Sequence, residues 1–179
     1  MEELFPLVNE NGDLIGKATR SFCHSGSFVL HPVVHLHVFN AAGLLFLQKR
    51  SMSKDIQPGM WDTSVGGHVD YEETLGVADW VRPALQREAS EELGIVCFEP
   101  VFVYQYSFRS VYEYELVHTF LTVYDGPLKV DPVEISEGRF WDRSEILANL
   151  GKGVFTPNFE GEIAIVLEAF LPYATNLFR

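Results

Sequence analysis

Three glutamates near the end of one predicted helix constrain this chain more than any other feature of its sequence. They lie within residues 87–94, Arg-Glu-Ala-Ser-Glu-Glu-Leu-Gly, and helical spacing places on one face Glu88, Glu91 and Glu92. An adjacent apolar stripe is formed by Leu85, Ala89 and Leu93. Gly94 is the residue type that commonly ends a helix. The chain must therefore fold around a helix whose acidic face lies beside its packing face.

A solvated helix face is the simplest interpretation of these acids, but three features favour a cation site. Glu88 and Glu92 repel each other at i, i+4, and Arg87 is spaced to pair with Glu91 only. The negative end of the helix dipole also disfavours carboxylates in the last turns. Clustered carboxylate oxygens are the ligands that Mg²⁺ and Mn²⁺ take, usually together with substrate phosphates. We therefore expect a divalent metal here.

The rest of the chain predicts a mixed α/β (α+β) fold. Residues 33–39 alternate apolar and histidine side chains with a period of two, which is typical of a β-strand. An Asn-Gly turn at residues 11–12 predicts a hairpin between residues 7–8 and 14–15. Apolar and aromatic runs predict further strands at residues 44–47, 61–65, 101–108 and 116–124, the second of them ending at Gly66.

Two helices are predicted near the C-terminus. Residues 144–150 form a short helix with Ser144 as its N-cap. Residues 160–171 place on one helical face Ile163, Val166, Leu167 and Phe170. The expected architecture is a mixed β-sheet covered by helices.

Length and composition predict a single domain over residues 1–179. The chain is 47% hydrophobic and carries no repeat or linker-like segment. Cys23 and Cys97 are too few for a disulfide framework, so we expect both to be reduced. No apolar run is long enough to span a membrane, and no signal peptide is visible, so we expect a cytoplasmic protein.

The charge of the chain narrows the class of its partners. A net charge of −12 opposes a phosphate backbone, which disfavours binding to nucleic acid. Any phosphate that the protein handles should therefore arrive with a metal ion. A small molecule is the expected partner. The sequence does not indicate whether the protein is a monomer or an oligomer.

Residues 67–95 resemble the signature of the Nudix hydrolases, which reads Gly, five residues, Glu, seven residues, Arg-Glu-apolar-x-Glu-Glu-x-Gly-apolar. The matching residues are Gly67, Glu73, Arg87, Glu88, Glu91, Glu92, Gly94 and Ile95. Thirteen residues, 74–86, separate Glu73 from Arg87, and Ala89 replaces a larger aliphatic residue. We expect Pro83 in the first turn of the helix, with residues 79–82 bulging outward.

This resemblance implies a Nudix-type mixed β-sheet sandwiched between α-helices. It also implies hydrolysis of a diphosphate linkage in a nucleoside diphosphate derivative. Mg²⁺ or Mn²⁺ would be held by Glu88, Glu91 and Glu92, while Glu73 and Arg87 would orient the loop and the helix. The metal would lower the pKa of a bound water, and Glu91, Glu92 or a more distant acid would be the general base.

A longer stretch, residues 9–141, resembles one branch of that family, the isopentenyl-diphosphate isomerases and their hydrolase relatives. This resemblance implies a second metal, for which the ligands would be His24, His31, His68, Glu113 and Glu115. Three imidazoles and two carboxylates suit Mn²⁺, Zn²⁺ or Fe²⁺. The alternative is that these are ordinary loop histidines and solvent-facing strand glutamates. Three other histidines are expected to be strand residues beside the core: His35, His37 and His118.

The isomerase reaction requires a cysteine acid/base immediately before Gly67-His68, and this chain has Gly66 there. Cys23 and Cys97 fall elsewhere, and Glu88 occupies a position where the isomerases carry arginine. We therefore expect a hydrolase. An isomerase-like enzyme and a catalytically idle diphosphate-binding module are the alternatives.

Basic and aromatic residues between positions 49 and 61 are candidates for substrate binding. The charges of Lys49, Arg50 and Lys54 suit phosphate, and Trp61 suits stacking on a base. No motif identifies the group attached to the diphosphate.

Overall fold

A seven-stranded mixed sheet forms the centre of the protein in a computed structural model, which describes residues 2–54, 56–74 and 79–174. Its strands are β3 (Leu30–Phe39), β4 (Leu45–Arg50), β5 (Trp61–Asp62), β6 (Val65–His68), β7 (Val101–Arg109), β8 (Tyr114–Val123) and β9 (Ile135–Trp141). β3 and β8 pair in parallel, and the other paired strands are antiparallel. β3 is buried along its whole length, because β8 and β6 flank it and helices cover it.

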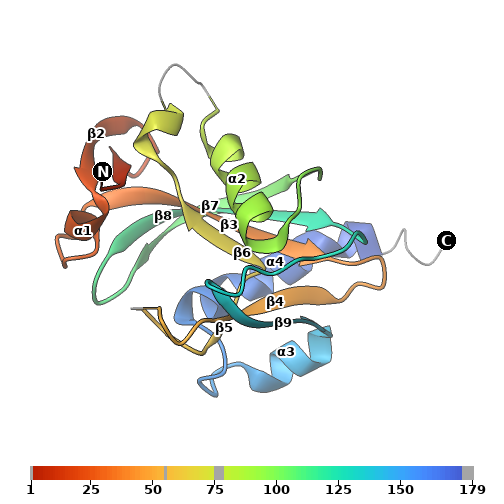
Figure 1. Cartoon of the computed structure of the whole chain (residues 1–179). Coiled ribbons are helices and arrows are strands. Elements are labelled where there is room, and N and C mark those ends of the chain that lie inside the picture. Colours follow the sequence, from red (N-terminus) through yellow and green to blue (C-terminus); the bar gives the residue numbers. More distant parts are fainter. Residues whose placement is uncertain (1, 55, 75–78, 175–179) are drawn as a thin grey trace.

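Helices cover both faces of this sheet (Figure 1). α2 (Val81–Leu93) packs on one face through the predicted apolar stripe, whose three residues are all buried. α4 (Pro157–Ala174) packs on the other face, and its buried residues include all four that the sequence predicts. The short helix α3 (Arg143–Asn149) contributes Ile146 to the same core cluster as α4. The mixed sheet between helices that the sequence predicts is therefore confirmed.

A separate hairpin lies at one end of the sheet. β1 (Leu4–Val8) pairs with β2 (Leu14–Thr19), and the short helix α1 (Arg20–Cys23) follows directly. The hairpin is the one predicted around the Asn-Gly turn, and Gly12 has the positive φ that this turn requires. Packing of this hairpin beside β3 brings the N-terminal segment to the functional cleft described below.

Four details differ from the sequence analysis. Residues 61–65 do not form one strand ending at Gly66; β6 continues through both glycines to His68, because β3 pairs with it. The strand β9 has no counterpart among the predicted elements. α3 is capped by Asp142, whose carboxylate accepts from the amide of Glu145, and Ser144 lies inside the helix. Val81 and Arg82 belong to α2 and are not part of an outward bulge.

The ends of α2 follow the expected chemistry. Pro83 lies in the first turn, where its missing N–H leaves no intrahelical bond unmade. Gly94 adopts a left-handed conformation with φ 68°, and its N–H caps the last turn. This fixes the helix end that carries the three glutamates. No helix in the described part of the chain is long and apolar enough to cross a membrane.

Candidate active site

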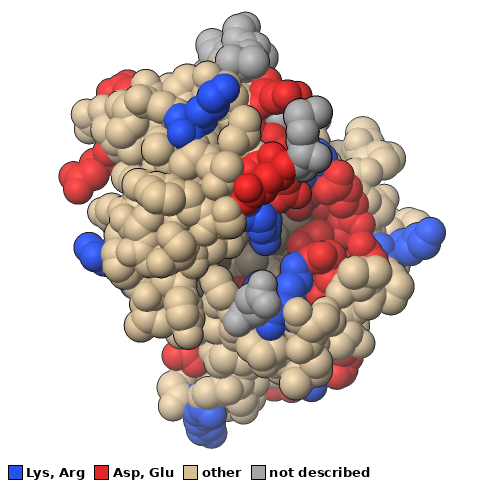
Figure 2. Space-filling view, turned by 60° about the vertical axis from the view of Figure 1, so that its left-hand side comes forward, with Lys and Arg blue, Asp and Glu red and all other residues tan. Residues whose placement is uncertain are grey.

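A cleft of about 610 Å³ opens beside the acidic face of α2. Figure 2 shows acidic side chains gathered around a hollow that also contains basic side chains. Its walls come from α2, β3, β6, the β7–β8 hairpin, α1 and the segment after β4. The cleft therefore brings together segments that are far apart in the sequence.

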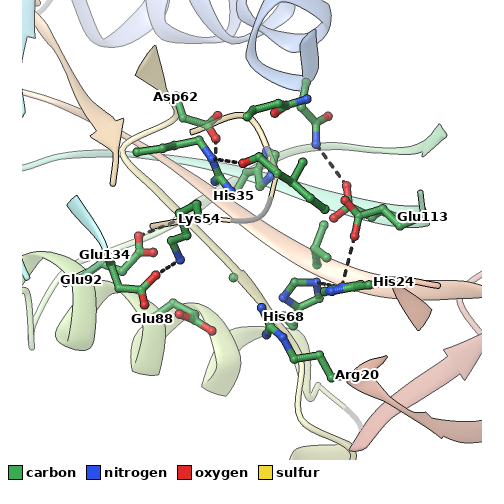
Figure 3. Close-up of a pocket in the computed structure, with 18 of the residues that line it drawn as sticks. Arg20, His24, His35, Lys54, Asp62, His68, Glu88, Glu92, Glu113 and Glu134 are labelled. Atoms are coloured by element: carbon green, nitrogen blue, oxygen red, sulfur yellow. Dashed lines mark hydrogen bonds and ion pairs between the residues drawn. The ribbon is translucent and has the colours of Figure 1, made fainter. Parts of the chain in front are cut away.

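Two of the predicted metal ligands, Glu88 and Glu92, lie together in one wall of this cleft (Figure 3). Burial raises the pKa of Glu92 to about 8, and the neighbouring charge of Glu88 acts in the same direction. Burial likewise raises the pKa of Glu88 to about 7. Glu91 also lines the cleft but has a side chain that is 59% exposed. Two raised carboxylate pKa values in one wall mark a position that is short of positive charge.

Arg87 connects the helix to the strand that crosses it. Its Nη1 donates to Oε1 of Glu88 at 2.8 Å and to Oε2 of Glu91 at 3.3 Å. Its Nη2 donates to the backbone carbonyl of His68 at 2.8 Å and lies 3.7 Å from Oδ2 of Asp70. The expectation that Arg87 pairs with Glu91 only is therefore wrong, because tertiary packing brings β6 and residue 70 within reach of the guanidinium.

The remaining signature residues lie on the loop side of the helix. Gly67 approaches α2 so closely that a Cβ at this position would overlap the side chain of Glu88. Glu73 belongs to the 3-10 helix Tyr71–Thr74, but its side chain lies outside the described part of the chain. Its ion pair with Arg87 therefore stays a prediction.

Four of the five predicted ligands for a second metal come together in a separate cluster. Their ligand atoms all lie within 4.8 Å of one another: His24, His31, His68 and Glu113. Nε2 of His24 lies 3.1 Å from Nε2 of His68 and 3.2 Å from Oε2 of Glu113. Nε2 of His31 is buried and has no hydrogen-bond partner among the described residues. Burial lowers the pKa of both His31 and His68, so both rings favour the neutral form that binds metals.

The structure does not place Glu115 in that group of ligand atoms. Its Oε2 instead accepts a hydrogen bond of 3.2 Å from Nδ2 of Asn158, at the start of α4. Burial raises the pKa of Glu115 to about 8, and the charge of Glu113 adds to this effect. Glu115 therefore lines the cleft next to the histidine cluster, and its role as a ligand is not supported by the geometry.

The predicted phosphate-binding residues divide into two groups. Arg50 and Lys54 line the cleft, where Arg50 is 3.2 Å from Oδ2 of Asp62 and Lys54 pairs with Glu134. Lys49 and Trp61 are not among the lining residues. Trp61 is 8% exposed and packs edge-on against Trp141 in the core, and the ammonium of Lys49 lies over its ring. The structure therefore places both residues outside the lining of the described cleft, Trp61 in the core and Lys49 with a side chain that is 37% exposed, and their contact with the substrate stays a prediction.

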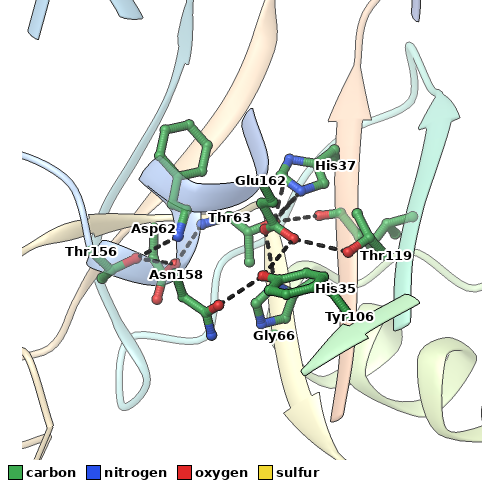
Figure 4. A network of polar contacts seen from close by, with 12 residues as sticks. His35, His37, Asp62, Thr63, Gly66, Tyr106, Thr119, Thr156, Asn158 and Glu162 are labelled. Carbon is green, nitrogen blue, oxygen red and sulfur yellow. Dashed lines mark hydrogen bonds and ion pairs between the residues drawn. The ribbon is translucent and has the colours of Figure 1, made fainter. Parts of the chain in front are cut away.

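A buried polar network beneath the cleft was not anticipated from the sequence (Figure 4). Glu162 of α4 is fully buried and binds two β3 histidines, His35 and His37, through its Oε1. Its Oε2 accepts from Thr119 at 2.9 Å and from Tyr106 at 3.2 Å. The signal was present, because Glu162 continues the apolar stripe of α4 at helical spacing and should therefore be buried.

Comparison with known proteins agrees with this architecture. The NUDIX domain family model matches residues 29–159. An isopentenyl-diphosphate Delta-isomerase 1 from Photorhabdus laumondii is 32% identical over 171 residues, which cover 90% of this chain and 93% of that protein. An uncharacterized Nudix hydrolase, lmo0368, from Listeria monocytogenes is 32% identical over 161 residues, with 89% and 90% covered.

A solved structure shows the same arrangement of elements. DR0079 from Deinococcus radiodurans superposes with a TM-score of 0.70 at 25% sequence identity, covering 93% of this chain and 98% of that one. The signature residues on α2 and β6, the sheet between helices and the match over most of the chain agree with one another. The chain belongs to the Nudix family.

Proposed function

We propose that this protein hydrolyses the diphosphate linkage of a nucleoside diphosphate derivative, with Mg²⁺ or Mn²⁺ held by Glu88, Glu91 and Glu92. One observation carries the proposal: the acidic face of α2 and two basic side chains, Arg50 and Lys54, line the same cleft. The carboxylates suit hard divalent ions, and the basic side chains suit phosphate oxygens. Nudix enzymes generally use these two metals.

The donor set of α2 fits such an ion. Two N–H groups, from the side chain of Gln48 and the backbone of Gly66, donate to Oε2 of Glu92 at 2.9 and 3.2 Å. Within the described chain these bonds fix the carboxylate and leave its other oxygen to a ligand. Burial raises the pKa of both Glu88 and Glu92, and a bound divalent cation would stabilise their negative charges.

The residues of the chain would share the work as follows. When bound, the metal supplies a water of lowered pKa and neutralises charge that develops on a phosphoryl oxygen. Arg87 orients Glu88 and the β6 end through its hydrogen bonds. Arg50 and Lys54 bind the diphosphate from the facing segment and hold it in place for attack. The general base would be Glu91, Glu92 or a more distant acid, and Glu91 is the most exposed of the three glutamates.

A second metal site is proposed at the cluster of His24, His31, His68 and Glu113. The mutual approach of four ligand atoms supports it, as does the unpartnered, buried Nε2 of His31. Imidazole and carboxylate donors of this kind suit Mn²⁺, Zn²⁺ or Fe²⁺. This metal would be separate from the ions held by the glutamates of α2.

An isomerase is the second candidate, because several relatives carry that name. Neither cysteine lines the described cleft: Cys23 is buried, which raises its pKa to about 11, and Cys97 is exposed. Gly66 occupies the position at which the isomerases require their cysteine. A catalytically idle module is disfavoured by the complete set of acids on α2.

A substrate screen tests the proposal. Nucleoside diphosphates, nucleotide sugars, dinucleotides and isoprenoid diphosphates are each incubated with the protein and Mg²⁺ or Mn²⁺, and the products are separated by ion-exchange chromatography. We expect cleavage between the phosphorus atoms of a nucleotide derivative, abolished by EDTA. Absence of cleavage in the whole panel, or full activity in EDTA, would contradict it.

A further inference from the structure

His35 occupies an unusual place between a buried carboxylate and the cleft. Its Nδ1 donates to Oε1 of Glu162 at 2.9 Å, and the carboxylate is completely buried. The ring itself lines the cleft. Among the described residues, the ring of His35 makes its hydrogen bond through Nδ1. Nε2 makes none with them, and this atom is not fully buried. The second ring nitrogen is therefore presented to the cleft.

Gly66 leaves this side of the ring uncovered, and Figure 4 shows His35 between Glu162 and Gly66. A Cβ built on Gly66 would lie 3.6 Å from Cδ2 and 3.7 Å from Nε2 of His35, which is ordinary van der Waals contact. A side chain would therefore fit at this position, but it would cover the nitrogen. Without one, an atom of a ligand can reach Nε2.

The surroundings of His35 keep the ring positively charged. Burial acts to lower the pKa of His35, but the charge and hydrogen bond of Glu162 outweigh this effect and raise the pKa to about 9. Asp62 and Glu115 also favour the charged ring. Both ring nitrogens of the charged form are donors, so Nε2 offers an N–H to the cleft.

Gly66 also links His35 to the acidic wall of α2. Its backbone N–H binds Oε2 of Glu92, so a ligand atom resting on Gly66 lies beside that wall. The groups nearest to such an atom are an imidazolium donor and carboxylates that suit a divalent ion. An anionic oxygen bound to the metal fits both.

We propose that His35 donates a hydrogen bond from Nε2 to an oxygen of the substrate's diphosphate that rests over Gly66, with Glu162 as the residue that positions the ring. The inference rests on the proposed function, because it assigns a further contact to the same substrate. The inference gives Gly66 a role, because the absence of a side chain there lets a ligand atom reach the charged ring of His35. It also explains why α4 contributes a charged residue to an otherwise apolar face.

His37 provides a matched control. Its Nε2 lies 3.0 Å from the same oxygen of Glu162, but its side chain is 0% exposed and does not line the cleft. Both histidines therefore contribute to the same buried network, and only His35 reaches the ligand. Comparing a His35 variant with a His37 variant therefore distinguishes the loss of a substrate contact from damage to the buried network.

The experiment measures binding of methylenediphosphonate, a diphosphate analogue that cannot be hydrolysed at its bridge, by isothermal titration calorimetry with Mg²⁺ present. The variants are His35→Asn, which keeps a donor near Nδ1, Gly66→Ala, which covers Nε2, and His37→Gln, which keeps a donor near its Nε2. Loss of a charge-assisted hydrogen bond predicts weakening of about 10- to 100-fold for the first two. His37→Gln should bind within about twofold of the wild type.

Each outcome bears on a distinct claim. Binding by the wild type together with unchanged affinity of His35→Asn and Gly66→Ala would overturn the inference and leave the proposed function standing. Equal weakening by His37→Gln would also overturn it, because the network would then be purely structural. No binding by the wild type would overturn both claims. Should His35→Asn fail to fold, as judged by circular dichroism, the tolerated Gly66→Ala variant decides alone.

Discussion

The backbone N–H of Gly66 donates a hydrogen bond of 3.2 Å to Oε2 of Glu92, tying the end of β6 to the acidic face of α2. The side chain of Gln48 binds the same oxygen at 2.9 Å. These two neutral donors fix the buried carboxylate of Glu92, but they do not compensate its negative charge. This arrangement makes the stability of the fold dependent on pH and on metal.

Replacement of Glu92 by glutamine should stabilise the metal-free protein at high pH. The pKa of Glu92 is about 8 in the folded state and about 4.5 in the unfolded state. The protonated side chain therefore makes its full contribution to the stability of the fold below about pH 4.5. That stability is lost as the pH rises through about 8. The Glu92→Gln variant avoids the loss, and its Tm should exceed that of the wild type by several degrees at pH 9, since about 1 kcal/mol shifts Tm by roughly 2–4 °C at this size.

Calorimetric scans in EDTA at several pH values check this prediction. The difference in Tm should shrink as the pH falls towards 5, and saturating Mg²⁺ should abolish it at pH 9. The exposed Glu168 of α4 supplies a control, because Glu168→Gln removes a carboxylate that is not buried. A difference of the same size at pH 5 and pH 9 would contradict the assignment of the effect to Glu92.

Substitution of Gly67 by alanine should damage the site more than the fold. The new Cβ would overlap the carboxylate end of Glu88, which is flexible enough to move aside. We expect Mg²⁺ affinity to fall by about 10- to 100-fold, as it does when a metal ligand loses its orientation, with a small change in Tm. Gly161→Ala is the control, since a Cβ there meets nothing within 4 Å. Unchanged Mg²⁺ affinity in Gly67→Ala would show that the position of Glu88 is unimportant.

The histidine cluster should bind one Mn²⁺ or Zn²⁺ in addition to the ions on α2. Titration followed by elemental analysis should give one ion fewer for the double variant His31→Ala, Glu113→Gln than for the wild type. Because burial lowers the pKa of His31 and His68, binding should persist somewhat below the ~6.5 pKa of free imidazole before protonation abolishes it.

Glu115→Gln serves as the control for this cluster, because Glu115 lies outside the group of converging ligand atoms. It should retain the full number of ions. If the double variant binds as many ions as the wild type with the same pH profile, the histidines are ordinary buried side chains.

The protein should not interconvert isopentenyl and dimethylallyl diphosphate. Gly66 supplies no proton where the isomerase cysteine is required, and neither cysteine of the chain lines the cleft. A direct isomerase assay, with Gly66→Cys assayed alongside, checks this. A Cβ at this position makes only ordinary van der Waals contact with Thr63 and His35, so we expect this variant to fold. Rapid turnover by the wild type would identify another proton donor and overturn the hydrolase assignment.

The sequence predicts the parts of this fold that depend on local pattern. The acidic face of α2, its apolar stripe and the glycine at its end follow from helical spacing alone, and each is confirmed. β9 escapes prediction because Gly138 and three polar residues interrupt its pattern, and pairing with β4 decides its conformation. In the same way β6 runs through two glycines because β3 pairs with them.

The site is predictable only in part, because tertiary contacts place its residues. The converging histidines come from the residue after α1, from β3 and from β6, and their approach needs the fold as well as the spacing. Trp61 and Lys49 were expected at the substrate because their chemistry suits it, but they pair with each other across β5 and β4 and lie outside the lining of the cleft. His35 resembles an ordinary strand residue until Glu162, 127 positions later, lies against it.

The central claim is that the acids of α2 hold the metal that drives diphosphate hydrolysis. The most direct test measures kcat for the best substrate of the screen with wild type, Glu88→Gln and the surface control Glu168→Gln, across a titration of Mg²⁺. We predict that Glu88→Gln lowers kcat by about 100-fold or more with the fold intact, while Glu168→Gln matches the wild type. Full activity of Glu88→Gln at every Mg²⁺ concentration would contradict the claim.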